Sequence, residues 1–146
     1  MTDKDVFWMK KAMEQAQIAY EKEEIPVGCI ITYGDKIIAK AHNQTQMLSD
    51  PTAHAEMIAI TAACDYIGGK YLKDCTLYVT LEPCPMCAAA IHWSQLGKLV
   101  YAASDPKMGF SNYEPSLLPN CKTSGGIIAD PAQKLLQKFF KERREQ

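Results

Sequence analysis

The sequence has no long hydrophobic run and almost no net charge. None of its apolar stretches approaches the ~20 residues needed to cross a bilayer, and charged side chains recur through residues 1–24, which excludes a signal segment there. Glycine and proline number only 8 each, and no segment is repeated or of low complexity. These absences exclude membrane-spanning, collagenous and disordered chains. We therefore expect a cytoplasmic protein with no membrane partner.

The chain is long enough for one compact core. Its 146 residues, 47% hydrophobic and 23% charged, predict a single domain spanning residues 1–146. A chain of this length holds its core without disulfides, and a reducing cytoplasm disfavours them. We therefore expect the cysteines to be packing residues or metal ligands. They are Cys29, Cys64, Cys75, Cys84, Cys87 and Cys121.

Strand and helix patterns alternate along the chain after an opening hairpin. Apolar residues in steps of three and four predict helices, and short β-branched runs predict strands. The predicted helices are residues 3–24, 53–67, 85–95 and 131–144, and the predicted strands are residues 27–32, 36–41, 76–81, 99–103 and 127–129, with a loop over residues 104–124. This alternation predicts an α/β fold, a three-layer αβα domain with a central mixed five-stranded sheet.

Two short segments at predicted helix starts carry the residues suited to chemistry. The first contains His54 and Glu56, and the second contains Cys84 and Cys87. Cysteines spaced i and i+3 fall on one helical face and can bind one ion together. Helix N-termini favour the thiolate forms that Zn²⁺ requires. One imidazole and two thiolates make three zinc ligands and leave the fourth tetrahedral position to water, as in a catalytic site.

Two other interpretations fit these residues less well. A redox cysteine pair belongs on a different βαβ pattern and would leave His54 and Glu56 unexplained. A closed structural zinc site could recruit Cys64 or Cys75, but the sequence has no second CxxC and no HxxxH. The combination H-x-E with P-C-x-x-C is the signature of zinc-dependent deaminases, so a deaminase site is the favoured interpretation.

Further motifs carry a resemblance to a known family. They are Ile25-Pro26-Val27-Gly28, His42-Asn43, Asp50-Pro51-Thr52-Ala53-His54-Ala55-Glu56, Thr76-Leu77-Tyr78-Val79-Thr80-Leu81-Glu82-Pro83-Cys84 and Phe139-Phe140 with the basic tail after it. With these motifs the chain resembles, nearly from end to end, the bacterial tRNA-specific adenosine deaminases of the cytidine deaminase-like superfamily. The resemblance implies the fold of that superfamily and a homodimer.

The same resemblance implies hydrolytic deamination of adenosine to inosine at the wobble position of tRNA. It implies one Zn²⁺ per subunit, held by His54, Cys84 and Cys87, which activates a water molecule to attack C6 of the flipped adenine. It further implies that Glu56 moves protons between this water, the ring and the departing amine. Substrate-binding roles are implied for Asn43, for Ala55 through its backbone N–H, and for Pro83.

The C-terminal segment is the basic part of the chain. Its five basic residues, against the acidic pair Glu142 and Glu145, are Lys134, Lys138, Lys141, Arg143 and Arg144. A local basic cluster can bind phosphates although the net charge is near zero, and the resemblance implies that the RNA partner is the tRNA anticodon stem-loop. The candidate RNA contacts are Lys107, Phe140, Arg143 and Arg144. The alternative interpretation is a solvated helix face over a core of Leu135, Leu136 and Phe139.

Some residues depart from that family and are similar to guanine deaminases that act on the free base. These are Pro85, Trp93 and Tyr101-Ala102-Ala103. A free nucleobase deaminase, for guanine first and cytosine second, is therefore the alternative enzyme. Against it, Pro26-Val27-Gly28 stands where guanine deaminases tend to have Pro-Phe-Gly. Trp93 has a simpler interpretation as a buried aromatic, and Glu56 argues against a silent zinc protein that only binds partners.

Overall fold

A five-stranded mixed sheet forms the centre of the protein. The structure, a computed structural model, describes residues 2–113 and 117–145. The strands lie in the order β2-β1-β3-β4-β5. Their bounds are β1 Gly28–Tyr33, β2 Lys36–His42, β3 Cys75–Leu81, β4 Lys98–Ala103 and β5 Lys122–Ser124. Strands β2 and β3 both run antiparallel to β1, whereas β4 is parallel to β3 and β5 is parallel to β4. The predicted mixed five-stranded sheet is confirmed.

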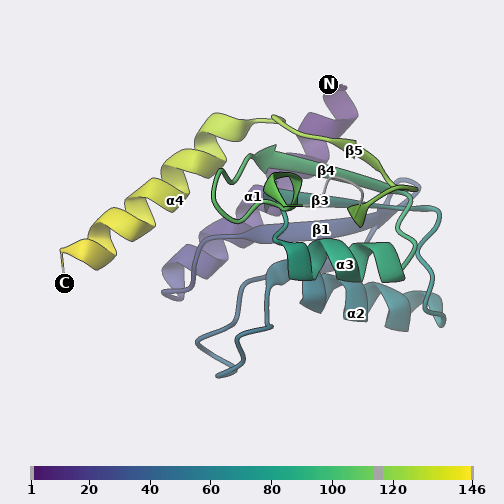
Figure 1. The fold of residues 1–146 in the computed structure, drawn as a ribbon, viewed down its shortest axis with the longest axis horizontal. Helices are drawn as coiled ribbons and strands as arrows, with labels where there is room; N and C mark the ends of the chain where they lie inside the picture. Colours follow the sequence, from purple (N-terminus) through teal and green to yellow (C-terminus); the bar gives the residue numbers. More distant parts are fainter. Residues whose placement is uncertain (1, 114–116, 146) are drawn as a thin grey trace.

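Two helices cover each face of this sheet. The helices are α1 Asp3–Glu21, α2 Ala55–Ile67, α3 Pro85–Trp93 and α4 Ala129–Arg144, and Phe110–Asn112 form a short 3-10 helix. Helices α2 and α3 lie together on one side of the sheet, and α1 and α4 lie on the other (Figure 1). The predicted three-layer arrangement is therefore confirmed. None of the helices in the described parts of the chain is long and apolar enough to cross a membrane.

The two cores follow from the alternation of side chains along the strands. In β1, Cys29 and Ile31 pack on the side of α2 and α3, whereas Ile30 packs on the side of α1 with Trp8 and Met9. Successive side chains of a strand point to opposite faces. Because both faces are covered by helices, the strands need apolar residues at consecutive positions, which explains their nearly continuous hydrophobic runs.

The last predicted strand is wrong. Residues 127–129 form no strand, although the backbone N–H of Ile127 donates to the carbonyl oxygen of Tyr101 in β4; the fifth strand is Lys122–Ser124, inside the segment predicted as a loop. Ile127 is buried with the core on the α1 side, and Ile128 has a φ of 46°, which is incompatible with a strand. Residues 114–116 of the predicted loop lie outside the described residues.

The segments that follow β2, β3 and β4 all begin at the same end of the sheet. The carboxyl ends of the parallel strands β3 and β4 lie side by side there, because Leu81 pairs with Ala103. Gly28 and His42 pair at the same edge, since Gly28 donates its N–H to Thr80 near the end of β3. Crevices outside the carboxyl ends of strands are the usual ligand sites of open α/β sheets.

Gly28 lets α1 lie directly against β1, and we expect Gly28→Ala to destabilise the fold. A Cβ at this position would lie 2.2 Å from the backbone N of Ala16 and 2.4 Å from the backbone O of Ala12. Because helix backbone cannot move aside cheaply, the free energy of unfolding should fall by about 3 kcal/mol. Urea denaturation measures this loss.

Gly69→Ala is the matched control. An added Cβ there meets no atom within 4 Å, so the free energy of unfolding should barely change. Equal urea midpoints for the two variants would contradict the close approach of α1 to β1.

Candidate active site

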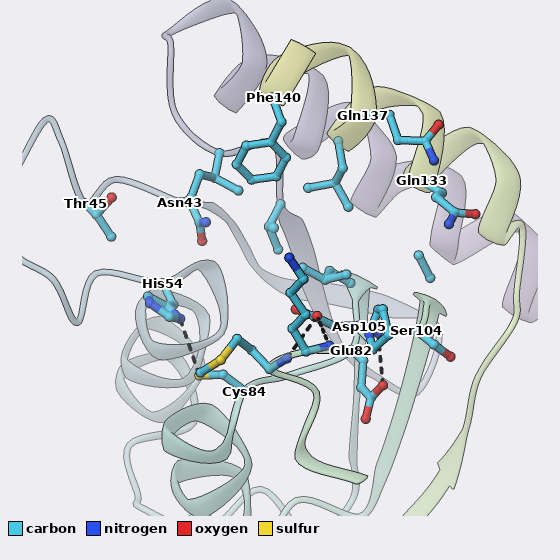
Figure 2. A pocket seen from close by; sticks show the side chains of 18 of the residues that line it. Asn43, Thr45, His54, Glu82, Cys84, Ser104, Asp105, Gln133, Gln137 and Phe140 are labelled. Carbon is cyan, nitrogen blue, oxygen red and sulfur yellow. Dashed lines mark hydrogen bonds between the residues drawn. The ribbon is translucent and has the colours of Figure 1, made fainter. Parts of the chain in front are cut away.

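His54, Cys84 and Cys87 converge at this edge of the sheet. His54 Nδ1 lies 3.7 Å from Cys84 Sγ and 3.5 Å from Cys87 Sγ. The three ligand atoms all lie within 4.8 Å of one another. Figure 2 shows the His54 ring and the Cys84 sulfur facing each other across the gap between α2 and α3. The structure therefore brings together three residues that are separated by up to 33 positions in the sequence.

The separations of these atoms fit a zinc ion. Tetrahedral zinc, about 2.3 Å from sulfur and about 2.0 Å from nitrogen, holds a sulfur and a nitrogen ligand about 3.5 Å apart. Within residues 2–113 and 117–145, no additional histidine, cysteine or carboxylate side chain joins these three as a fourth candidate ligand. Three protein ligands leave one coordination position for water or substrate, which is typical of catalytic rather than structural zinc.

The local fold prepares the ligands for a metal. His54 is the N-cap of α2 and Cys84 is the N-cap of α3, and neither side chain is used to cap its helix. Pro85 at the start of α3 fits there because the first turn needs no N–H from it. Hydrogen bonds from Cys87 and His54 lower the pKa of the Cys84 thiol to about 4. The positive ends of two helix dipoles stabilise the thiolate further.

Glu56 lies in the first turn of α2, next to this group. Its side chain is only 4% exposed, and it lines the same pocket as His54 and Cys84. Burial raises the pKa of Glu56 to about 7. A carboxyl group with such a pKa can both accept and donate a proton near neutral pH.

The group opens into a pocket of about 950 Å³. Its walls come from the loop after β2, the segment after β4 and the helix α4 (Figure 2). All the candidate RNA-contact residues lie in these walls, namely Lys107, Phe140, Arg143 and Arg144. The sequence alone did not suggest several other wall residues, because their types are common on any surface. They are Thr45, Asp105, Gln133 and Gln137.

Asn43 is held in place at the pocket wall. Its Oδ1 accepts the backbone N–H of Ala55 at 2.8 Å. Because the carbonyl oxygen faces that N–H, the Nδ2 group of Asn43 is the side that can donate to a ligand. The N–H of Ala55 is engaged with Asn43, so the implied contact between this N–H and the base stays a prediction. Pro83 is buried, does not line the pocket, and accepts a hydrogen bond from the N–H of Phe110 at 2.9 Å.

Trp93 is not the buried aromatic that its place on the cysteine helix suggested. It is 79% exposed at the end of α3. It lines a second cavity with Lys70, Tyr71 and Cys121, not the pocket that contains His54. Cys29 and Cys75 are buried free thiols, as expected for packing residues.

Comparisons with known proteins place the chain in one family. Residues 2–103 match the cytidine and deoxycytidylate deaminase zinc-binding region. The chain is 44% identical to a tRNA-specific adenosine deaminase of Aquifex aeolicus, over 94% of this chain and 95% of that protein. A solved structure from a study of A-to-I editing by tRNA:A34 deaminases at the wobble position of transfer RNA is 35% identical, with a TM-score of 0.82, over 88% of this chain and 98% of that one. A guanine deaminase of Bacillus subtilis is 39% identical, with a TM-score of 0.65, over 71% of this chain and 66% of that one. The chain therefore belongs to the cytidine and deoxycytidylate deaminase zinc-binding family.

Proposed function

We propose that the protein is a zinc-dependent hydrolase that converts adenosine to inosine at the wobble position of tRNA. One observation carries the proposal: ligand atoms with the separations of a zinc site lie beside the buried Glu56, in a pocket whose outer wall includes Arg143 and Arg144. The Aquifex aeolicus relative and the wobble-editing deaminase structure support the choice of substrate.

The residues of the pocket divide the reaction between them. His54, Cys84 and Cys87 would hold the zinc, which when bound supplies the Lewis acidity that lowers the pKa of a water molecule. Glu56 takes a proton from the attacking water at its carboxylate and passes protons to the ring nitrogen beside C6 and to the departing amine. The water oxygen replaces the amino group, and ammonia leaves.

The rest of the pocket suits an unstacked nucleoside. Asn43 is positioned to donate from Nδ2 to the nucleoside, since its Oδ1 is occupied by the N–H of Ala55. A volume of about 950 Å³ exceeds what one base needs, which fits a nucleotide still attached to neighbouring residues of an anticodon loop. Phe140 offers an aromatic face for stacking, and single-stranded RNA bases are usually recognised in this way.

Arg144→Gln is expected to weaken RNA binding. Arg144 lies in the pocket wall near the end of α4, where its guanidinium can pair with a phosphate. Removing one phosphate contact should lower the slope of log Kd against log salt by about 1. Fluorescence anisotropy with a labelled adenosine-bearing anticodon stem-loop, measured over a salt series, gives this slope.

Lys134→Gln is the matched control for this prediction. Lys134 lies on the same helix and carries the same charge, but it is not in the pocket wall. It should leave the salt slope nearly unchanged. Equal slopes for both variants would indicate that the helix attracts RNA only through its overall charge.

A substrate panel tests the proposed function. The zinc-loaded protein is given the anticodon stem-loop, free guanine and free cytosine in parallel, and ammonia and product masses are measured. We expect inosine in the stem-loop and no reaction of the free bases. Xanthine or uracil with an unreacted stem-loop would instead establish a free nucleobase deaminase, an alternative favoured by the likeness to the Bacillus subtilis guanine deaminase.

We propose further that residues 1–146 act as one catalytic domain, within a homodimer in the cytoplasm. All six cysteines are free, which suits a reducing compartment. Trp93 and Leu48 are large apolar side chains that are 79% and 53% exposed, and the proposed dimer interface would bury side chains of this kind.

A further inference from the structure

Glu82 is a buried carboxylate that the proposed reaction does not use. It follows β3 and precedes the zinc-ligand segment, and only 3% of its surface is exposed. Carboxylates are almost never buried to this degree unless they are paired. Lysine and arginine side chains form no salt bridge with it within the described chain. Its partners are instead donors of the segment that follows β4.

Three donors of that segment bind the two oxygens of Glu82. Oε1 accepts the backbone N–H of Asp105 at 3.1 Å. Oε2 accepts the backbone N–H of Ser111 at 3.0 Å and the Ser111 hydroxyl at 2.6 Å. These bonds connect the two ends of residues 105–111 to one side chain. Hydrogen bonds to an ionised acceptor are about twice as strong as neutral ones.

Gly109 makes room for this arrangement. A Cβ at Gly109 would lie 2.4 Å from both the carboxyl carbon and Oε1 of Glu82, and 2.6 Å from the backbone O of Asp105. The loop therefore wraps closely around the carboxylate, and only a residue without a side chain fits at this point.

The contacts continue from Glu82 to the pocket wall. Asp105, fixed through its backbone N–H, uses Oδ1 to accept the N–H groups of Lys107 and Met108, both at 3.0 Å. Asp105, Lys107 and Met108 all line the pocket. Figure 2 shows Glu82 directed away from His54 and Cys84 and toward Asp105. Glu82 thus acts on the wall of the pocket opposite the zinc ligands.

We propose that Glu82 is a positioning residue that holds residues 105–111 in the conformation that binds substrate. The inference rests on the proposed function for its substrate, but the anchoring of the loop is independent of that assignment. A displaced wall should weaken binding of the substrate far more than it slows the chemical step, because none of the groups that move protons or bind metal belongs to the loop.

Glu82→Gln tests this role, since it retains the shape of the side chain but removes the charge and one acceptor. Dissociation constants for the anticodon stem-loop are measured by anisotropy with Glu56→Gln present to prevent turnover. The turnover number is measured in the chain with Glu56 intact, and zinc content and hydrogen–deuterium exchange are measured as well. We expect about a tenfold rise in Kd, faster exchange over residues 104–111, and turnover and zinc content within about twofold of the parent.

Gly109→Ala is a second variant that disturbs the same contacts without changing Glu82. We expect it to have the same effects, so it tests the proposal even if Glu82→Gln fails to fold. Glu14→Gln, on the exposed face of α1, is the control and should change none of these quantities. Unchanged exchange over residues 104–111 in both loop variants would overturn the proposal. So would loss of zinc and turnover with an unchanged Kd, because Glu82 would then support the metal ligands. A wild-type chain that does not deaminate the stem-loop would refute the proposed function, and the exchange result would still decide whether Glu82 anchors the loop.

Discussion

Glu56→Gln is expected to abolish deamination while the zinc remains bound. Glutamine has nearly the same shape as glutamate, but it cannot take a proton from water or deliver one to the ring. Glu56 is buried beside Cys87 and lines the pocket, so it is the carboxyl group placed to move these protons. Loss of a general acid and base costs about 10²–10⁴-fold in rate. Ammonia release from the stem-loop, with zinc measured by mass spectrometry, tests the prediction.

The control for this variant is the dissociation constant of the stem-loop, which should change little. Retained turnover with full zinc content would show that another group moves the protons. A protein that loses both zinc and folded structure would instead show that Glu56 supports the fold.

Cys84→Ala is expected to release the zinc and to eliminate activity. The Cys84 sulfur is partly exposed at the N-terminus of α3, so its removal leaves no large cavity in the core. Cys87 is fully buried and packs against the core, which makes it a less clean choice. Bound zinc should fall to background. The melting temperature should fall as well, because a metal that binds only the folded state stabilises it.

Cys121→Ala serves as the matched control, since Cys121 is also a partly exposed free thiol but lies outside the zinc-ligand group. It should retain zinc and activity. Full zinc content in Cys84→Ala would contradict the proposed ligand set and would require another side chain in its place.

The helices and the first four strands were predictable because their patterns of apolar and polar residues follow from which of their faces are buried. Runs such as Leu77 to Val79 are apolar at every position, since both faces of the sheet are covered. The fifth strand had no such signal. Lys122, Thr123 and Ser124 are all exposed, and they join the sheet through backbone pairing with β4. The strand was predicted over residues 127–129 instead, because Ile127 is apolar. Ile127 lies in a turn, from which its side chain packs into the core.

The convergence of His54, Cys84 and Cys87 was predictable because the spacing of these residues and their positions at helix starts are local features of the sequence. The roles of the surrounding residues are not local. In the sequence, Glu82 is one residue of the motif that ends a strand, and nothing marks it as a loop anchor. Its partners Asp105 and Ser111 lie 23 and 29 positions away. Gln133 and Gln137 look like ordinary solvent-facing residues until α4 is placed over the pocket. Such contacts exist only in the tertiary structure.

Reaction in water enriched in ¹⁸O tests the central claim most directly. The zinc-loaded protein is incubated with the adenosine-bearing anticodon stem-loop, and the wobble nucleoside is then analysed by mass. Hydrolytic deamination predicts inosine that carries one oxygen from the solvent, together with released ammonia. Unreacted adenosine at the wobble position, or inosine without the heavy oxygen, would contradict the account.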